Sequence, residues 1–416
     1  MVKTAEELYK EREKRVSDAV QLKVPDRVPF MSMFHFFPAK YAGISFEQVM
    51  YDYEKMADAS KQVITDLEMD MYFNPFSLVA YGPLMEALDF KQVKWPGHGV
   101  SPDRAFQFVE GEYMTADEYD AFLSDPSDYM LRTYFPRVSG ALEPLKSLPY
   151  LPELYYFRVL TGTSALAAPE VVDALETLLK AGAESVKMTV KLREFVKDMT
   201  DLGFPAQVGG VAYAPFDYIG DFFRGTRGIM IDMYRNPDKL IAAMEKILPV
   251  LVSSATSSAK RAGIPGVFIP LHKGHHGLMS LEQFKTFFWP TLQKLMLALI
   301  DEGLMPCPLF EGDYTSRLDI IKDIPAGKAI YWFEQTDVFK AKEVLGDRVC
   351  IRGNVPASLL CTGTPQEVRD YCKKLIDIVG KGGGFIMDGG TGIPDEARIE
   401  NVKAMADFTR EYGVYK

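Results

Sequence analysis

Gly266-Val-Phe-Ile-Pro-Leu271 is the stretch of sequence that decides the fold. It is the first of five short apolar runs in the second half of the chain, and the others are residues 305–310, 329–333, 348–352 and 384–387. A polar or glycine-rich loop and then a helical pattern follow each run, which is typical of βα units around a parallel sheet. We therefore expect an α/β fold of the (β/α)8 TIM barrel type, with a doubly wound open sheet as the alternative.

The first half of the chain carries a less regular version of this pattern. Its apolar runs are residues 28–37, 69–73 and 207–213. Residues 106–155 are rich in Pro, Asp, Tyr and Phe, and they predict a lid or insertion rather than a separate domain. We expect one domain spanning residues 1–416, with an elaborated N-terminal half.

A capping-box pattern, in which Ser or Thr is followed three residues later by Glu or Gln, marks several segments. They begin at Ser45, Thr115, Ser280 and Thr364. The hydroxyl and the longer side chain satisfy backbone N–H groups reciprocally, so each pattern predicts the start of a helix.

Composition limits the classes of function. The 416 residues include 57 acidic and 47 basic side chains, a net charge of −10 that argues against a nucleic-acid binder. The four cysteines form no CxxC pair, which is typical of reduced thiols. No run approaches the roughly 18 consecutive apolar residues that span a bilayer. The first twenty residues are charged throughout and predict a surface helix rather than a secretory signal, so we expect a cytoplasmic protein with no membrane partner.

The loop after the first of these runs concentrates histidine. His272, His275 and His276 are three of the five histidines in the chain, and glycines flank them. Histidines at this spacing supply metal ligands or general acid and base groups. The alternative is a solvated polar loop with one capping histidine. We take His272 and His275 as candidate catalytic residues and metal ligands.

Acidic residues follow the next two runs. Glu311 and Asp313 come after Phe310, and two carboxyl groups in one pocket share a proton or a cation. The alternative is that Asp313 caps the next helix and Glu311 pairs with Arg317. Glu311 is the third candidate catalytic residue and metal ligand. Glu334 follows the third run and is a candidate substrate-binding residue, whereas Asp337 is expected to cap a helix over residues 338–345.

Four other residues are candidates for substrate binding. Asn354 and Asp388 follow the fourth and fifth runs, and the glycine-dense loop after Asp388 could bind an anion through its amides. His35 and Phe216 lie in aromatic segments that could line a pocket for a flat ligand.

Several of these segments resemble the uroporphyrinogen decarboxylase superfamily. The resemblance is carried by Gly353-Asn-Val-Pro356, by residues 359–365, 382–386, 392–394 and 400–404, and by the earlier segments Arg27-Val-Pro-Phe30 and Ala214-Pro-Phe216. It extends over nearly the whole chain and implies a single (β/α)8 barrel whose site lies at the carboxyl ends of the strands.

Departures from the family patterns indicate the branch. The arginine-rich segment with which the decarboxylases bind propionates is replaced by Phe34-His-Phe-Phe-Pro-Ala-Lys40. The His-x-Cys pair and later Cys that hold zinc in the thiol methyltransferases fall on Leu309, Glu311 and Thr391. The resemblance therefore implies a corrinoid-dependent methyltransferase of the O-demethylase kind, which passes a methyl group from a methoxylated small molecule to a corrinoid-binding partner protein.

Two roles for the histidines and Glu311 follow from this resemblance. They hold a zinc ion that polarises the substrate oxygen, or they supply an acid proton to it. The alternative functions are a lyase that decarboxylates a tetrapyrrole or another carboxylic acid, and a tetrapyrrole carrier without catalysis.

Overall fold

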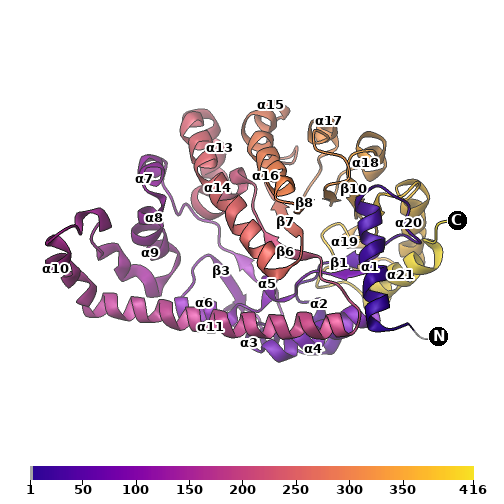
Figure 1. The fold of residues 1–416 in the computed structure, drawn as a ribbon, viewed down its shortest axis with the longest axis horizontal. Coiled ribbons are helices and arrows are strands. Elements are labelled where there is room, and N and C mark those ends of the chain that lie inside the picture. The colour runs from indigo at the N-terminus through magenta and orange to yellow at the C-terminus, as the bar shows by residue number, and fades with distance from the viewer. Residues whose placement is uncertain (1–2) are drawn as a thin grey trace.

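The computed structural model describes residues 3–416 (Figure 1). Six parallel strands form one sheet in the order β11-β10-β9-β8-β7-β6, and β1 and β2 form a separate parallel pair. The strands are β1 (Met31–Ser32), β2 (Met71–Tyr72), β6 (Val208–Val211), β7 (Gly266–Leu271), β8 (Met305–Phe310), β9 (Ile330–Phe333), β10 (Cys350–Arg352) and β11 (Phe385–Ile386). A small outer sheet contains β3 (Val93–Pro96), β4 (Gly99–Val100) and β5 (Gln107–Phe108).

Single parallel bridges connect the two-stranded pair to both edges of the six-stranded sheet. Phe30 bridges to Met387 beside β11, and Tyr72 bridges to Ala206 before β6. The parallel α/β architecture that the sequence predicted is confirmed. The hydrogen-bonded ladder does not run continuously through all eight strands, so the structure shows an open six-stranded sheet rather than a closed barrel.

All eight of these strands lie within the apolar runs identified in the sequence. Every residue of β7 is buried, because a parallel strand covered on both faces must be apolar throughout. The capping boxes at Ser45, Thr115, Ser280 and Thr364 are formed as predicted.

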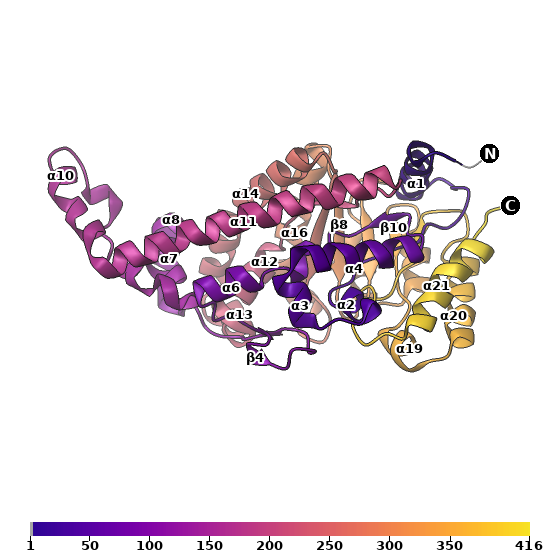
Figure 2. The same ribbon diagram turned by 90° about the horizontal axis from the view of Figure 1, so that it is seen from below.

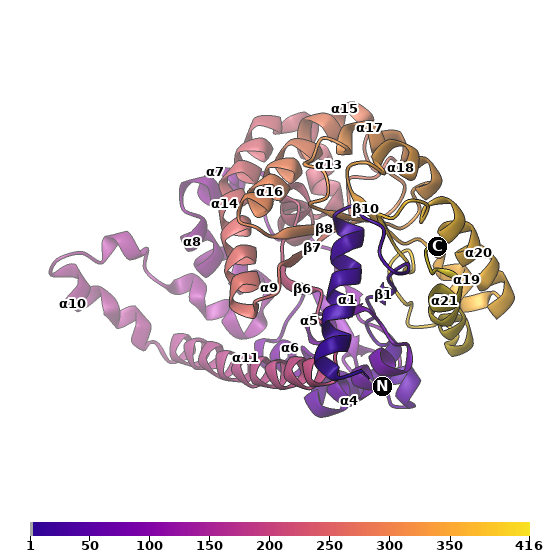
Figure 3. The same ribbon diagram turned by 45° about the vertical axis from the view of Figure 1, so that its right-hand side comes forward.

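The helix α1 (Ala5–Val20) covers the amino-terminal ends of the strands (Figure 3). Its buried face, with Val16, Ala19 and Val20, packs against residues of β1, β8, β9, β10 and β11. Asp70 connects this region to the sheet, since it accepts hydrogen bonds from Arg15, Arg27 and the N–H of Phe30. The helix α1 is thus fixed on the side opposite the loops that follow the strands.

The other helices surround the sheet. Those of the first half are α2 (Phe37–Ala42), α3 (Phe46–Tyr51), α4 (Tyr53–Asp66), α5 (Phe76–Val79), α6 (Gly82–Leu88) and α11 (Pro169–Asp201). Those of the second half are α12 (Pro215–Ile219), α13 (Gly225–Arg235), α14 (Pro237–Ala262), α15 (Leu281–Gln283), α16 (Trp289–Asp301), α17 (Leu318–Ile321), α18 (Val338–Leu345), α19 (Ala357–Thr362), α20 (Pro365–Ile378) and α21 (Ile399–Tyr412). By length and composition α14 could cross a membrane, but one of its faces packs against β6 and α16.

Residues 106–155 contain the strand β5 and a series of short helical segments. They include α7 (Tyr119–Ser124), α8 (Pro126–Tyr129), α9 (Phe135–Val138) and the 3-10 helix η3 (Gly140–Ser147). These segments pack mainly on α14 and α11. A lid function for them stays a prediction.

Residues 151–168, which we call the arm, extend away from this body. They contain the helix α10 (Arg158–Gly162) and the 3-10 helices η4 (Leu151–Glu153) and η5 (Thr163–Ala167). The arm lies at the far left in Figures 1 and 2, at the end of the 33-residue helix α11.

Candidate active site

A cavity of about 410 Å³ opens where three neighbouring strands end. His272, Glu311 and Glu334 are the first residues after β7, β8 and β9, so parallel packing brings their side chains to one mouth. The cavity is lined by these three residues and by His275, His276, Gly277, Gly312, Asp313 and Gln335. The structure therefore brings together all three predicted catalytic residues and Glu334.

Two aspartates hold the His272 segment in place. Asp217 is fully buried and accepts hydrogen bonds from the backbone N–H groups of His272 and Lys273, at 3.0 Å each. Asp221 contacts Nδ1 of His272 at 2.6 Å and also accepts a hydrogen bond from Lys273 Nζ. Asp221 thereby fixes the orientation of the imidazole ring and directs Nε2 towards the cavity.

The charge of His272 follows from these neighbours. Burial alone lowers the pKa of His272, but the hydrogen bond to Asp221 and the negative charges of Asp217, Asp221 and Glu311 raise it to about 9. Despite its burial, Asp221 has a pKa below its ordinary value because His272 and Lys273 donate hydrogen bonds to it. His272 is therefore an imidazolium at neutral pH.

Glu311 faces this imidazolium. Its Oε1 lies 3.7 Å from His272 Nε2, and its side chain is 37% exposed. Burial raises the pKa of Glu311 and the negative charge of Glu334 adds to this effect, while the positive His272 opposes it. Glu311 consequently holds a proton more readily than an exposed glutamate does, as a general acid requires.

Glu334 supports the loop that carries Glu311. Its Oε2 accepts the backbone N–H of Gly312 at 2.6 Å. Gly312 has φ of +83°, and a Cβ atom there would lie 2.7 Å from Cγ of His275, so this position requires glycine. Asn354 supports the loop that carries Glu334, because its Nδ2 donates to the backbone oxygens of Glu334 and Thr336.

The predicted zinc ligands share the cavity but do not form a ligand set. Among residues 3–416, no group of three or more His, Cys, Asp or Glu side chains is arranged to hold a metal ion. Nδ1 of His272 contacts Asp221, and Nδ1 of His275 accepts a hydrogen bond from the N–H of Gly277. In both rings Nδ1 is engaged, so Nε2 is the nitrogen that each ring could offer to a metal. Binding of zinc stays a prediction from the sequence.

Four residues predicted to bind substrate are not among those that line this cavity, namely His35, Phe216, Asn354 and Asp388. Phe216 is fully buried and packs its ring against Phe288, because the aromatic run to which it belongs forms core. His35 lies after β1 near Phe106, and burial lowers the pKa of its imidazole to about 4.

Asp388 is also fully buried. It pairs with Arg352, whose guanidinium lies 3.8 Å from the ring centroid of Trp332, and it accepts a hydrogen bond from Ser32. Its carboxylate therefore belongs to the polar interior between the strands rather than to the cavity.

The alternatives for the acidic loops are resolved by their hydrogen bonds. Asp313 caps the next turn by accepting the N–H of Thr315 at 2.7 Å, and Asp337 caps α18 as expected. Arg317 donates instead to the backbone oxygen of Met279, so no ion pair with Glu311 appears in the part of the chain that the structure describes.

Asp217, Asp221 and Lys273 are site residues that the sequence analysis missed. The two aspartates follow β6, on α12 and on the π-helical turn η6 (Gly220–Arg224). They lie four and eight residues beyond the apolar run at residues 207–213, so they do not directly follow a strand as Glu311 and Glu334 do.

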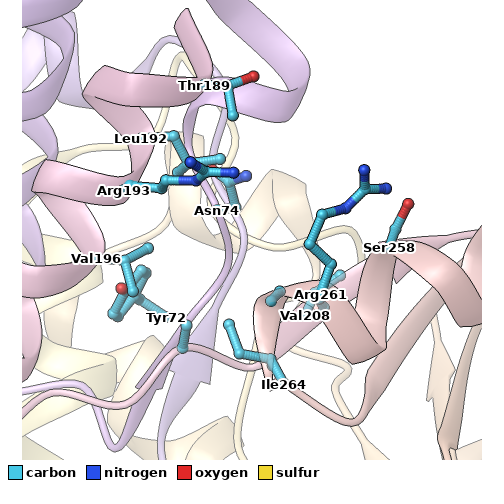
Figure 4. A pocket seen from close by; sticks show the side chains of 13 residues that line it. Tyr72, Asn74, Thr189, Leu192, Arg193, Val196, Val208, Ser258, Arg261 and Ile264 are labelled. Atoms are coloured by element: carbon cyan, nitrogen blue, oxygen red, sulfur yellow. The ribbon is translucent and has the colours of Figure 1, made fainter. Parts of the chain in front are cut away.

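A second cavity, of about 400 Å³, lies outside the sheet between α11 and α14. Figure 4 shows Arg193 and Arg261 on its two sides, above apolar side chains that include Val196 and Ile264. No two titratable side chains contact one another in its described lining, so it lacks the acid–base arrangement of the first cavity.

Residues 162–412 match the family described as uroporphyrinogen decarboxylase (URO-D). The uroporphyrinogen decarboxylase of Chlorobium phaeovibrioides is 25% identical over 256 residues, which cover 59% of this chain and 68% of that protein. That of Chloroherpeton thalassium is 24% identical over 268 residues, covering 62% and 71%.

A solved methyltransferase from Methanosarcina mazei has a similar structure, with a TM-score of 0.64. The similarity covers 96% of this chain and 98% of the methyltransferase, at 17% sequence identity. At 17% sequence identity this similarity shows a shared fold and nothing about the reaction.

Proposed function

The chain belongs to the uroporphyrinogen decarboxylase family, and from this premise we propose that it is a methyltransferase. It removes the methyl group of a methoxylated small molecule and transfers it to the corrinoid of a partner protein. The observation that carries the proposal is the pairing of an imidazolium, His272, with the raised-pKa carboxyl group of Glu311 in one cavity. Such a pair donates a proton to an oxygen atom that leaves with negative charge.

The charge of the lining favours an ether over a polycarboxylate. Three carboxyl groups, those of Glu311, Asp313 and Glu334, border the cavity, and no arginine or lysine is among the described residues that line it. A tetrapyrrole with several carboxylates needs fixed cations, preferably arginines, for binding. This observation argues against the lyase that the names of the relatives suggest.

The residues of the chain act on the leaving oxygen. When the bond between this oxygen and the methyl carbon breaks, its electron pair stays on oxygen, which accepts a proton from Glu311 or from Nε2 of His272. Asp221 holds the imidazole ring, and its negative charge keeps the ring protonated between turnovers. The corrinoid supplies the nucleophile that takes the methyl carbon.

The size of the cavity is consistent with a small substrate that binds inside it and a corrinoid that stays outside. At about 410 Å³ it is in the range of sites for one small molecule, and a corrinoid has to approach from outside the mouth. Partner docking is then transient, with a small interface.

We further propose that the eight parallel strands act as one (β/α)8 barrel in a single domain over residues 1–416, and that the protein works in the cytoplasm.

The test is a three-component reaction. The protein is mixed with a reduced corrinoid protein and a panel of methoxylated aromatic compounds, and methylcobalt absorbance is followed. We expect the absorbance change only when all three components are present. Release of carbon dioxide from a carboxylic acid by the protein alone, with no methylcobalt from any compound, would refute the proposal in favour of the lyase.

A further inference from the structure

The arm exposes an unusual concentration of large apolar side chains. Tyr156 is 80% exposed, Leu160 72% and Phe157 66%. Leu151, Tyr155, Val159 and Leu166 are also exposed. Isolated exposed apolar residues are common on soluble proteins, but a contiguous group of this kind marks an interaction surface.

The arm is ordered by its own contacts and not by the body of the protein. The ring centroids of Tyr156 and Phe157 are 4.3 Å apart, and Arg158 lies over the ring of Tyr155. The main contacts of α10 are with η5, and η5 in turn packs on the beginning of α11. The exposed rings therefore have no covering element in the part of the chain that the structure describes.

The helix α11 places the arm on the same side as the cavity. Its C-terminal end leads to the start of β6, so it runs antiparallel to the strands and begins on the side of their carboxyl ends. With 33 residues it is about 50 Å long, whereas a six-residue strand spans only about 20 Å. The arm consequently stands well beyond the sheet, as Figures 1 and 2 show.

The size of the exposed surface matches one half of a stable interface. An aromatic side chain has about 200 Å² of surface, so the three rings alone expose on the order of 400 Å². The four exposed aliphatic side chains bring the arm towards the roughly 800 Å² that each partner buries in a standard complex.

The charge of the arm indicates which partner covers it. Glu153 and Arg158 are the only charged residues in the segment 151–168, although the whole chain carries a net charge of −10. Two copies of an acidic protein repel each other, and a contact through an almost uncharged surface minimises that repulsion. Tyrosine and phenylalanine at the centre of such a surface are typical of protein–protein interfaces.

We propose that the arm binds the arm of a second copy of this chain and forms a twofold-symmetric dimer. In such a contact the same patch serves both copies, so the self-complementary apolar surface is sufficient. The proposal is independent of the reaction that the cavity performs.

Sedimentation equilibrium tests the proposal at chain concentrations from about 1 to 100 µM. The wild-type protein should be a dimer, and Tyr156→Ser combined with Leu160→Ser should weaken the dimer roughly 100-fold. The matched control is Tyr234→Ser, at a tyrosine that is 77% exposed on α13, and it should leave the dimer unchanged. A wild-type monomer at the highest concentration, or a double variant that dimerises as well as the wild type, would overturn the proposal.

Cross-linking provides a second measurement that does not depend on weakening the contact. Cys361 is partly exposed while Cys307, Cys350 and Cys372 are buried, so a Cys361→Ser background offers few accessible thiols. In that background Leu160→Cys should yield covalent dimers with a short bismaleimide, and Tyr234→Cys should not. Equal cross-linking of the two variants would contradict the arm contact, as would arm-dependent binding of a corrinoid protein to a monomeric chain.

Discussion

His272 differs from the other histidines of the chain because acids surround it on both sides. Asp221 contacts its Nδ1 and Glu311 faces its Nε2, whereas His35 lies among aromatic rings. The same side chain is thus charged at one position and neutral at the other near pH 7, as the directions of their pKa values show. The surroundings of each histidine, rather than the residue type, therefore determine whether it can act as an acid at neutral pH.

Glu311→Gln tests the acid role. The variant keeps the shape of the side chain but has no carboxyl proton, so turnover should fall by about 100-fold or more. Stability should change by less than about 1 kcal/mol, because the side chain is partly exposed at a strand end. Steady-state rates and urea unfolding measure the two effects. Glu282→Gln, 81% exposed on α15, is the matched control, and equal activities of the two variants would exclude the role.

Asp221→Asn tests the electrostatic support of His272. Loss of the carboxylate lowers the pKa of His272, so the basic limb of the pH–rate profile should move to lower pH. In the wild type the imidazolium is present below a pKa of about 9 and is lost as the pH rises through it. The matched control Asp120→Asn, at an exposed residue paired with Lys239, should keep the wild-type profile. An unshifted basic limb in Asp221→Asn would show that His272 does not control the rate.

At the scale of elements, capping residues determine where helices begin. Thr364 opens α20 with a complete capping box, in which its side chain and that of Glu367 satisfy backbone N–H groups reciprocally. This helix then packs one face, through Val368, Cys372 and Leu375, on the core.

Thr364→Ala should lower the free energy of unfolding by about 1 kcal/mol, because it leaves a backbone N–H at the first turn without its partner. Urea denaturation followed by circular dichroism measures the loss. Thr362→Ala is the control, since the hydroxyl of Thr362 only bonds back to the oxygen of Ser358 on an exposed helix face. A loss as large for Thr362→Ala would indicate a general effect of removing threonine.

The regular elements are also where the sequence was most informative. Glu311 and Glu334 could be located because each directly follows an apolar run, and the position of a strand fixes the position of the residue after it. Asp221 was missed because it lies in a π-helical turn after an irregular first-half strand. Phe216 and Asp388 were misplaced because an apolar or acidic residue near a strand end has the same sequence pattern whether it lines a cavity or the interior. The arm has no periodicity that predicts exposed rings.

At the scale of the whole molecule, Asp70 joins the N-terminal segment to the sheet. It is fully buried and pairs with Arg15 of α1 at 2.5 Å and with Arg27 at 2.8 Å. Asp26 pairs with the same Arg15 but is 64% exposed. The two acids therefore share a partner and differ in burial.

Asp70→Asn should destabilise the protein by about 3 kcal/mol, because it removes the buried counter-charge of Arg27 and leaves Arg15 with the exposed Asp26 alone. Asp26→Asn should cost less than about 1 kcal/mol, since an exposed ion pair contributes little. Thermal unfolding of the two variants gives both values. Similar losses in the two variants would mean that burial of the aspartate does not determine how much each ion pair contributes to stability.

The surroundings of Trp332 have a consequence for the fluorescence of the protein. Its indole lies fully buried against Arg352, and its Nε1 donates to the backbone oxygen of Gly389 at 2.9 Å. The other two tryptophans, Trp95 and Trp289, are buried as well. Native fluorescence should therefore be emitted at short wavelength and should shift to the red on unfolding. The difference between the wild type and a Trp332→Phe variant would give the signal of Trp332 on β9, two residues before Glu334, apart from the signals of Trp95 on β3 and Trp289 on α16.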